Sequence, residues 1–175
     1  MNENVLVAYA TRYGSTAEVA EAVGTRLRER GFQVDVKAAK QAGSLEGYDV
    51  VVFGTPFYLG AMLKEGRAWL ESHRAALETR PNAIFAFGPT SAADDLAETA
   101  KQLDKVLGEL SWLEPVAARM FVGAYDPAGL RFADRLLTKL PASPLHGLGA
   151  HDDRDWEAIE DWADGTAEAL KTAGR

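Results

Sequence analysis

The chain has 175 residues, which suits a single domain with a sizeable hydrophobic core, and we expect residues 1–175 to form one. Its net charge of −7 argues against nucleic-acid binding, because a phosphate backbone would be repelled. The absence of cysteine excludes disulfides, thiol chemistry and cysteine-held iron–sulfur clusters. With no apolar run of about 20 residues and no signal peptide before the first strand, we expect a cytoplasmic protein.

Residues 5–10 predict a buried parallel strand, and a turn rich in hydroxyl groups follows it directly. The residues of this turn are Thr11, Arg12, Tyr13, Gly14, Ser15 and Thr16. A helical pattern begins at Ala17. The N–H groups at a helix N-terminus are unpaired and carry a partial positive charge, so the turn is suited to binding a phosphate group.

The same residues allow a second interpretation. Ser15 and Glu18 also fit a capping box, with Ser15 as the N-cap and Glu18 reaching back to it. The turn lacks the lysine and spacing of a Walker A loop and the three-glycine dinucleotide fingerprint, so ATP, GTP and NAD fit poorly. A ligand whose phosphate is held by hydroxyl and amide groups fits better, and ordinary helix capping stays open as the alternative.

Strands and helices then alternate along the chain. We expect strands at residues 32–36, 50–54, 83–87 and 116–123, and helices at 16–30, 65–77, 94–110 and 156–170, the last capped by Asp155. Five buried strands joined by helices predict an α/β fold with a doubly wound parallel sheet. Ligands of such sheets bind beyond the carboxyl ends of the strands, so the loops after the first, third, fourth and fifth strands are the candidates.

Those loops have distinctive compositions. The loop after the third strand contains Pro56, Phe57, Tyr58, Leu59 and Gly60. Its two aromatics, expected to be exposed, suit a flat ring, although a hydrophobic loop packed under the next helix is the alternative. The loop after the fourth strand begins with Gly88, Pro89 and Thr90, small residues that let a backbone approach a ligand closely. A phosphate-binding turn beside loops of these compositions predicts a binding site for FMN.

On these motifs the chain resembles the flavodoxin family over nearly its whole length. Thr11, Gly14 and Thr16 match the family's T-x-x-G-x-T phosphate loop. Residues 56–60 and 88–91 correspond to the loops that flank the isoalloxazine ring in the family. The resemblance implies a five-stranded parallel sheet in the order 2-1-3-4-5, with helices on both faces, and FMN as the cofactor.

Within that superfamily the chain is most similar to the menaquinone-dependent protoporphyrinogen IX dehydrogenase family. The segments that carry this likeness are residues 11–14, 122–125, 132–135 and 155–157. The likeness implies an FMN-dependent oxidoreductase of heme biosynthesis that uses a quinone acceptor. That family tends to be basic and membrane-associated, whereas this chain is acidic.

Residues 130–140 predict an amphipathic helix that a plain electron carrier would lack. Arg131, Arg135 and Lys139 follow one another at i, i+4 and i+8. They form either a solvated face of a packing helix or a basic patch for carboxylates or an anionic lipid surface. Residues 88–93 contain no aromatic, so we expect one face of the flavin to be open to a substrate.

Two functions follow from these observations. One is an FMN oxidoreductase that moves electrons between a small organic substrate and a quinone-like acceptor. The other is a non-catalytic electron carrier that docks to redox partner proteins through its acidic surface. No catalytic side chain is predicted, because the flavin takes the electrons, and Tyr125 and Asp126 are the only candidates for handling protons. The histidines show no metal-ligand spacing, so no metal is expected.

Overall fold

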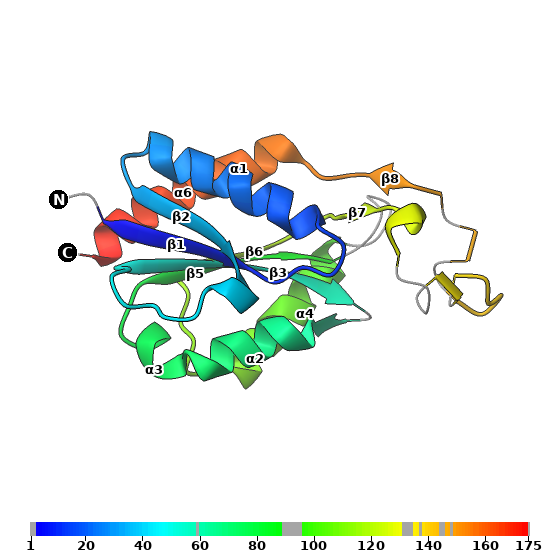
Figure 1. Cartoon of the computed structure of the whole chain (residues 1–175), viewed down its shortest axis with the longest axis horizontal. Helices are drawn as coiled ribbons and strands as arrows, with labels where there is room; N and C mark the ends of the chain where they lie inside the picture. The colour runs from blue at the N-terminus through cyan, green and yellow to red at the C-terminus, as the bar shows by residue number, and fades with distance from the viewer. Residues whose placement is uncertain are drawn as a thin grey trace.

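The computed structural model describes residues 3–58, 60–88, 96–130, 135–136, 138–143, 146–147 and 149–174. Five parallel strands form the centre of the molecule in the order β2-β1-β3-β5-β6 (Figure 1). They are β1 (Asn4–Tyr9), β2 (Gln33–Ala38), β3 (Val50–Tyr58), β5 (Asn82–Phe87) and β6 (Ala117–Phe121). The order confirms the predicted 2-1-3-4-5 arrangement and the flavodoxin-like fold class.

Helices cover both faces of this sheet (Figure 1). One face is covered by α1 (Ser15–Glu29) and α6 (Trp156–Ala173), and the other by α2 (Lys64–Ser72), α3 (Arg74–Leu77) and α4 (Leu96–Glu109). Short elements complete the fold, namely η1 (Ala39–Gln41), β4 (Ala61–Met62), β7 (Ala124–Tyr125), η2 (Pro127–Gly129) and β8 (His151–Asp152). The side chain of Asp155 accepts a hydrogen bond from the Ala158 N–H group, which confirms the predicted cap of the last helix.

Covering on both faces explains why the central strands are apolar throughout. Successive side chains of a strand point to opposite faces, so β1 contributes to two cores. Leu6 packs in the core under α2 and α4, whereas Val5 and Val7 pack in the core under α1 and α6. All three side chains are fully buried. The sheet is therefore a rigid support, and the segments beyond its strand ends are positioned by it.

Two predicted elements differ from the structure. The helix expected at residues 65–77 is broken at His73, where φ is −105°. The ring of His73 lies tilted against Trp69 at 4.3 Å between centroids, and its Nε2 lies 3.0 Å from the Gly43 carbonyl oxygen. These contacts hold His73 against its neighbours and separate α2 from α3. The third strand extends to Tyr58, because its last residues pair antiparallel with β4.

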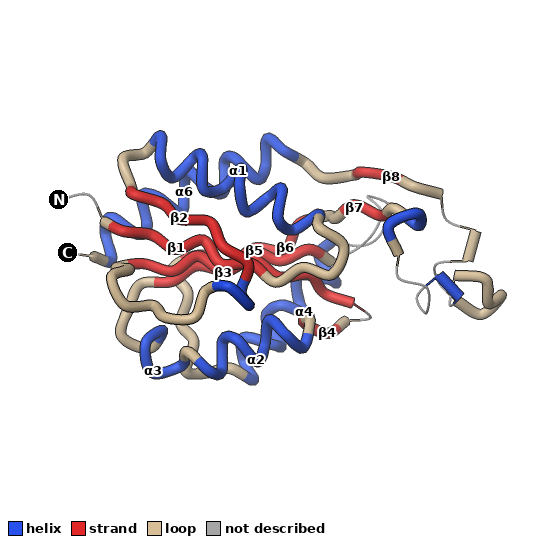
Figure 2. The backbone as a smooth tube through the Cα atoms, in the orientation of Figure 1, coloured by secondary structure: helices blue, strands red, loops and turns tan. Residues whose placement is uncertain are grey.

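The segment between β7 and β8 also departs from the expectation. Its described parts lie beyond the carboxyl edge of the sheet (Figure 2). Residues 131–134 and 137, and with them Arg131, lie outside the described residues. Of the expected helix at 130–140, residues 135–136 are helical and 138–140 form a turn, so the predicted end at Leu140 is wrong. In the described ranges, no helix has the length and apolar character needed to cross a membrane.

Candidate functional site

The turn after β1 is shaped by Thr11 and Gly14. The Gly14 N–H group donates a 2.8 Å hydrogen bond to Oγ1 of Thr11. Gly14 has φ of +94°, a left-handed conformation that glycine adopts without a steric penalty. The Ala17 N–H group then donates to the Gly14 carbonyl, so α1 begins directly after the turn. The amino end of the helix is thus presented at the carboxyl edge of the sheet.

The capping-box interpretation of this turn is wrong. The N-cap of α1 is Gly14, not Ser15, and no side chain caps the helix. The Glu18 carboxylate accepts a 2.5 Å hydrogen bond from Arg154 instead of reaching back to residue 15. Thr16 is buried in the first turn, with 1% of its surface exposed. The first turn therefore has no side-chain acceptor of the kind that a capping box supplies.

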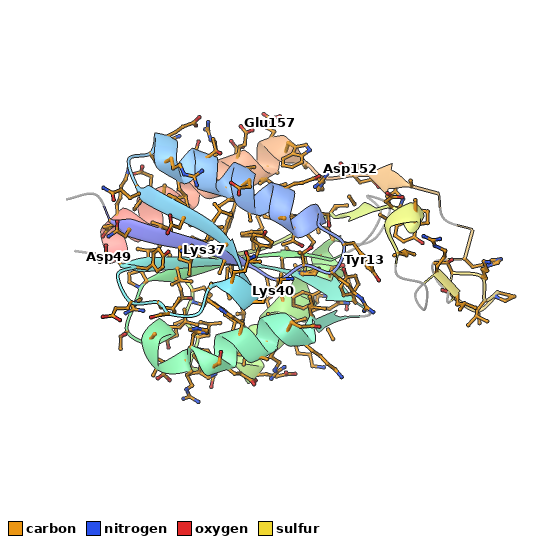
Figure 3. All side chains as sticks on the ribbon, in the orientation of Figure 1. Tyr13, Lys37, Lys40, Asp49, Asp152 and Glu157 are labelled. Atoms are coloured by element: carbon orange, nitrogen blue, oxygen red, sulfur yellow. The ribbon has the colours of Figure 1, made fainter. Side chains whose placement is uncertain are left out.

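The predicted loops after β1 and β3 meet at this edge. The Tyr13 and Tyr58 rings contact edge to face, with centroids 6.3 Å apart. The Arg12 guanidinium lies 5.7 Å from the Tyr13 ring and 5.9 Å from the Tyr58 ring. Figure 3 shows Tyr13 at the edge of the sheet where the central strands end. Three predicted site residues from two separate loops thus form one cluster.

The other residues predicted after β3 have different surroundings. Phe57 is 5% exposed and packs in the core under α2 and α4, so the expectation of an exposed ring is wrong for Phe57. Pro56 pairs with Phe87 within the sheet. Gly60 has φ of +79° in the turn between β3 and β4, and Leu59 lies outside the described residues. The hairpin of β3 and β4 turns Phe57 inward and leaves Tyr58 half-buried at the edge.

Gly88 is required for internal packing. A Cβ atom at this position would overlap Cγ2 of Thr99 and lie 2.9 Å from Sδ of Met120. The Gly88 N–H group donates a 3.0 Å hydrogen bond to the Phe121 carbonyl. The end of β5 therefore packs closely against both α4 and β6, which gives the glycine a role apart from any ligand. Pro89 and Thr90, predicted to belong to the same loop, lie outside the described residues.

Tyr125 and Asp126, the candidates for proton handling, differ in their bonding. The Asp126 carboxylate accepts a 2.9 Å hydrogen bond from Ala128 N–H and so caps η2. Tyr125 is 7% exposed, and its hydroxyl has no hydrogen-bond partner in the described part of the chain. Burial, and secondarily the charge of Asp126, raise the pKa of Tyr125 above its ordinary value. The Tyr125 hydroxyl is therefore buried without a hydrogen bond in the described residues, whereas the Asp126 carboxylate caps η2.

Sequence reasoning missed His151, which lies opposite Tyr125 in the β7–β8 pair. The two ring centroids are 5.7 Å apart. Nδ1 of His151 lies 3.0 Å from the Gly149 carbonyl oxygen, and Nε2 is buried without a hydrogen bond inside the described ranges. No local motif marks this histidine, since the pairing of two-residue strands brings it to Tyr125.

Arg154 was also missed. Its side chain is 8% exposed and binds both oxygens of the Asp152 carboxylate. Nη1 donates to Glu18 at 2.5 Å and to the Ser15 carbonyl at 3.3 Å. The hydrogen bonds that Arg154 donates to Asp152, the largest cause, and to Glu18 raise the pKa of Arg154 and keep it charged. Arg154 thereby joins β8 to the first turn of α1.

Other parts of the molecule offer weaker candidates. A surface cavity of about 410 Å³ is lined by residues that include Ser44, His73 and Arg80. It adjoins α3, near the amino ends of the strands and away from the turn after β1 (Figure 1). Across the described residues no cluster of His, Asp and Glu has the geometry of a metal site.

A doubly wound sheet of this order, with a hydroxyl-rich turn opening its first helix, defines a flavodoxin-like α/β protein. Residues 6–148 match the family model described as the flavodoxin domain, and the chain belongs to that family. Members of this family typically bind FMN.

Individual relatives agree with this assignment. The chain is 26% identical to a protoporphyrinogen IX dehydrogenase [quinone] of Escherichia coli (strain K12), over 90% of this chain and 91% of that protein. It is 44% identical to a flavodoxin of Nitratidesulfovibrio vulgaris over 54 residues, which are 29% of this chain and 36% of the flavodoxin. A short-chain flavodoxin associated with a non-canonical PDU bacterial microcompartment has the same fold. Its TM-score is 0.61 at 16% identity, with 99% of both chains covered.

Proposed function

We propose that this flavodoxin-domain protein binds FMN at the carboxyl edge of its sheet. The single observation that carries the proposal is the uncapped start of α1 behind the Thr11–Gly14 hydrogen bond. Hydroxyl groups of Thr11, Ser15 and Thr16, together with the backbone N–H groups of residues 12, 13, 15 and 16, would hold the phosphate. Charge-assisted hydrogen bonds of this kind contribute roughly 1.5–3 kcal/mol each, so several would hold a dianion without a lysine.

The isoalloxazine ring would lie beside the cluster of Arg12, Tyr13 and Tyr58. Aromatic rings at this edge offer the flat apolar contact that a flavin needs. The full set of residues proposed for the cofactor is Thr11, Arg12, Tyr13, Gly14, Ser15, Thr16, Pro56, Phe57, Tyr58, Leu59, Gly60, Gly88, Pro89, Thr90, Tyr125 and Asp126. Within it Phe57 belongs to the core, so its place in the set rests on the loop that it shares with Tyr58.

The activity that we propose is that of an FMN-dependent oxidoreductase, similar to protoporphyrinogen IX dehydrogenase with a quinone acceptor. The support is the match to that enzyme over nine tenths of both chains. Bound FMN supplies two-electron chemistry between substrate and acceptor. The chain's own part is to orient the ring, to exclude water around it and to hold a proton at the buried Tyr125 hydroxyl.

Exposed cations near this edge support an anionic substrate. Arg135 and Lys139 are exposed, and the apolar side chains of Leu136 and Leu140 beside them are 50% and 54% exposed. Nη2 of Arg135 donates a 2.9 Å hydrogen bond to the Ala128 carbonyl, which ties the segment to η2. Such a surface attracts the carboxylates of a substrate or the headgroups of an anionic membrane.

The alternative function is a non-catalytic electron carrier that docks to redox partner proteins. The net charge of −7 favours it, as does the local match to a flavodoxin. Turnover separates the two functions, because a carrier would not oxidise a small substrate by itself.

Two measurements test the proposal. Cofactor released from the reconstituted protein should run as FMN on reversed-phase chromatography, and recovery of FAD or no flavin uptake would contradict FMN binding. Anaerobic turnover with protoporphyrinogen IX and a menaquinone analogue should follow the FMN content of the protein. FMN binding without turnover would support the carrier.

Reversing the charges of Arg131 and Lys139 tests whether exposed cations attract the substrate. The variant Arg131→Glu/Lys139→Glu leaves Arg135 and its hydrogen bond to Ala128 in place. It should keep FMN and lose turnover most strongly at low salt, because salt screens exposed charges. Cosedimentation with phosphatidylglycerol vesicles distinguishes the carboxylates of a substrate from the headgroups of an anionic membrane. Loss of turnover without vesicle binding indicates a substrate contact.

A further inference from the structure

Arg154 brings two acidic side chains of distant segments together beside the proposed phosphate turn. Glu18 lies in the first turn of α1, and Asp152 lies in β8. The guanidinium group binds both carboxylates at 2.5 Å and also contacts the Ser15 carbonyl at 3.3 Å. Figure 3 shows Asp152 on the segment that leads from β8 past the start of α1 to α6.

This arrangement has an electrostatic cost for an anion. The two carboxylates and one guanidinium of the group sum to one negative charge at the amino end of α1. Without Arg154 the sum would be two negative charges at the place where a phosphate dianion must bind. Like charges repel, so the second uncompensated negative charge would weaken the binding of a phosphate beside this helix terminus.

We propose that Arg154 is a positioning residue that makes the site selective for the phosphorylated flavin, by neutralising Glu18 and Asp152 beside the phosphate turn. This inference rests on the proposed FMN site and adds to it the discrimination between FMN and riboflavin. Because 8% of its side chain is exposed, Arg154 is poorly replaced by mobile salt ions. The cation also packs on the Trp156 ring, 4.8 Å from its centroid, which fixes its place.

The test measures the FMN-to-riboflavin ratio of affinities, which is the dissociation constant of riboflavin divided by that of FMN. The two ligands differ only in the phosphate group. Arg154→Gln should weaken FMN about two- to fivefold and leave riboflavin nearly unchanged, because the variant lacks one compensating positive charge beside the phosphate turn. Arg154→Lys, which keeps the charge, should restore most of the ratio. The triple variant Glu18→Gln/Asp152→Asn/Arg154→Gln, which has no charge left in the group, should restore the ratio as well.

A matched control lies at the other end of α1. Arg30 binds Asp164 of α6 at 2.5 Å, so Arg30→Gln removes a more exposed arginine–carboxylate ion pair far from the phosphate turn. It should leave the FMN-to-riboflavin ratio unchanged. The single variants Glu18→Gln and Asp152→Asn, which keep Arg154 in place, should raise the ratio. These two single variants also test the inference if Arg154→Gln does not fold.

The outcomes are distinguishable. Equal weakening of both ligands by Arg154→Gln would show a purely structural role and overturn the inference. An unchanged ratio in the neutralising variants, or no recovery in the triple variant, would overturn it too. If the wild-type protein binds neither ligand, the proposed function itself fails, and the inference fails with it.

Discussion

The Tyr58 ring, at the end of β3, meets the Tyr13 ring of the turn after β1 edge to face, with 6.3 Å between centroids. Tyr58 ends β3 and Tyr13 follows β1, and these two strands are parallel neighbours whose carboxyl ends lie at the same edge of the sheet. Arg12 lies near both rings and completes the cluster. The contact brings the turn after β1 next to the end of β3, the two segments proposed to bind the phosphate and the flavin ring.

The first prediction separates Tyr58 from Phe57. Tyr58→Ala should increase flavin fluorescence, because a stacked tyrosine quenches the emission, with little effect on the apoprotein. Phe57→Ala should lower the free energy of unfolding by roughly 3–5 kcal/mol, because it opens a cavity in the core. Fluorescence of bound flavin and urea unfolding of the apoprotein measure the two effects. Unchanged emission in Tyr58→Ala would place the flavin ring elsewhere.

The second prediction concerns the hydroxyl groups of the turn. Thr16→Val keeps the shape of the side chain and removes its donor, so FMN affinity should fall by roughly 1–3 kcal/mol. Ser15→Ala should leave the apoprotein within a few tenths of a kcal/mol, because Ser15 is not the N-cap. Titration with FMN and thermal melting of both variants check this. A loss near 1 kcal/mol in apo Ser15→Ala would restore the capping role that the structure does not show.

The third prediction concerns Gly88. Gly88→Ala should destabilise the apoprotein by roughly 1–3 kcal/mol, since the new methyl group would overlap Thr99. Gly108→Ala is the matched control, because a Cβ atom there meets nothing within 4 Å. In α4 that change should stabilise the protein by roughly 0.5–1 kcal/mol. Equal effects of the two changes in urea unfolding would contradict the close packing at Gly88.

The fourth prediction is a pH dependence of stability. Hydrogen bonds from Arg30, and then from Arg26, lower the pKa of Asp164 below its ordinary 3.8. A carboxyl group whose pKa is lower in the folded state stabilises the protein above the unfolded pKa, and this stabilisation disappears as pH falls through the folded value. Asp164→Asn should therefore melt below the wild type at pH 7, and the two melting curves should converge as the pH falls through the lowered pKa of Asp164. A difference that persists after this carboxyl group is protonated would indicate a contribution other than charge.

The fifth prediction tests the buried Tyr125 hydroxyl. Tyr125→Phe should leave the apoprotein as stable as the wild type or slightly more so, because the hydroxyl has no partner among the described residues. If this hydroxyl holds a proton for the flavin reaction, turnover should nevertheless fall.

Tyr48→Phe is the control for this change. The Tyr48 hydroxyl donates to Asp35 at 2.5 Å, so its loss should cost stability and leave turnover unchanged. Full turnover in Tyr125→Phe would remove that residue from the reaction.

The sequence by itself determined the class of fold. Apolar runs such as residues 5–7 and 50–53 require a sheet covered on both faces, and the alternation with helices requires parallel strands. The turn at residues 11–16 was recognisable for the same local reason, because a strand, a glycine-containing turn and a helix follow one another directly.

Only the tertiary structure decided which side chains of the site meet. A β-hairpin with β4 turns Phe57 into the core, although its neighbour Tyr58 stays at the edge, and alternation along a strand gives the reason. Arg154 reaches Glu18, and His151 lies opposite Tyr125, across long separations in the chain. Such contacts depend on how β8 returns to the sheet edge after β7. No hydrophobic periodicity or local motif encodes that return. The sequence therefore indicated which loops form the candidate site, and only the packing of distant segments decided which of its side chains meet.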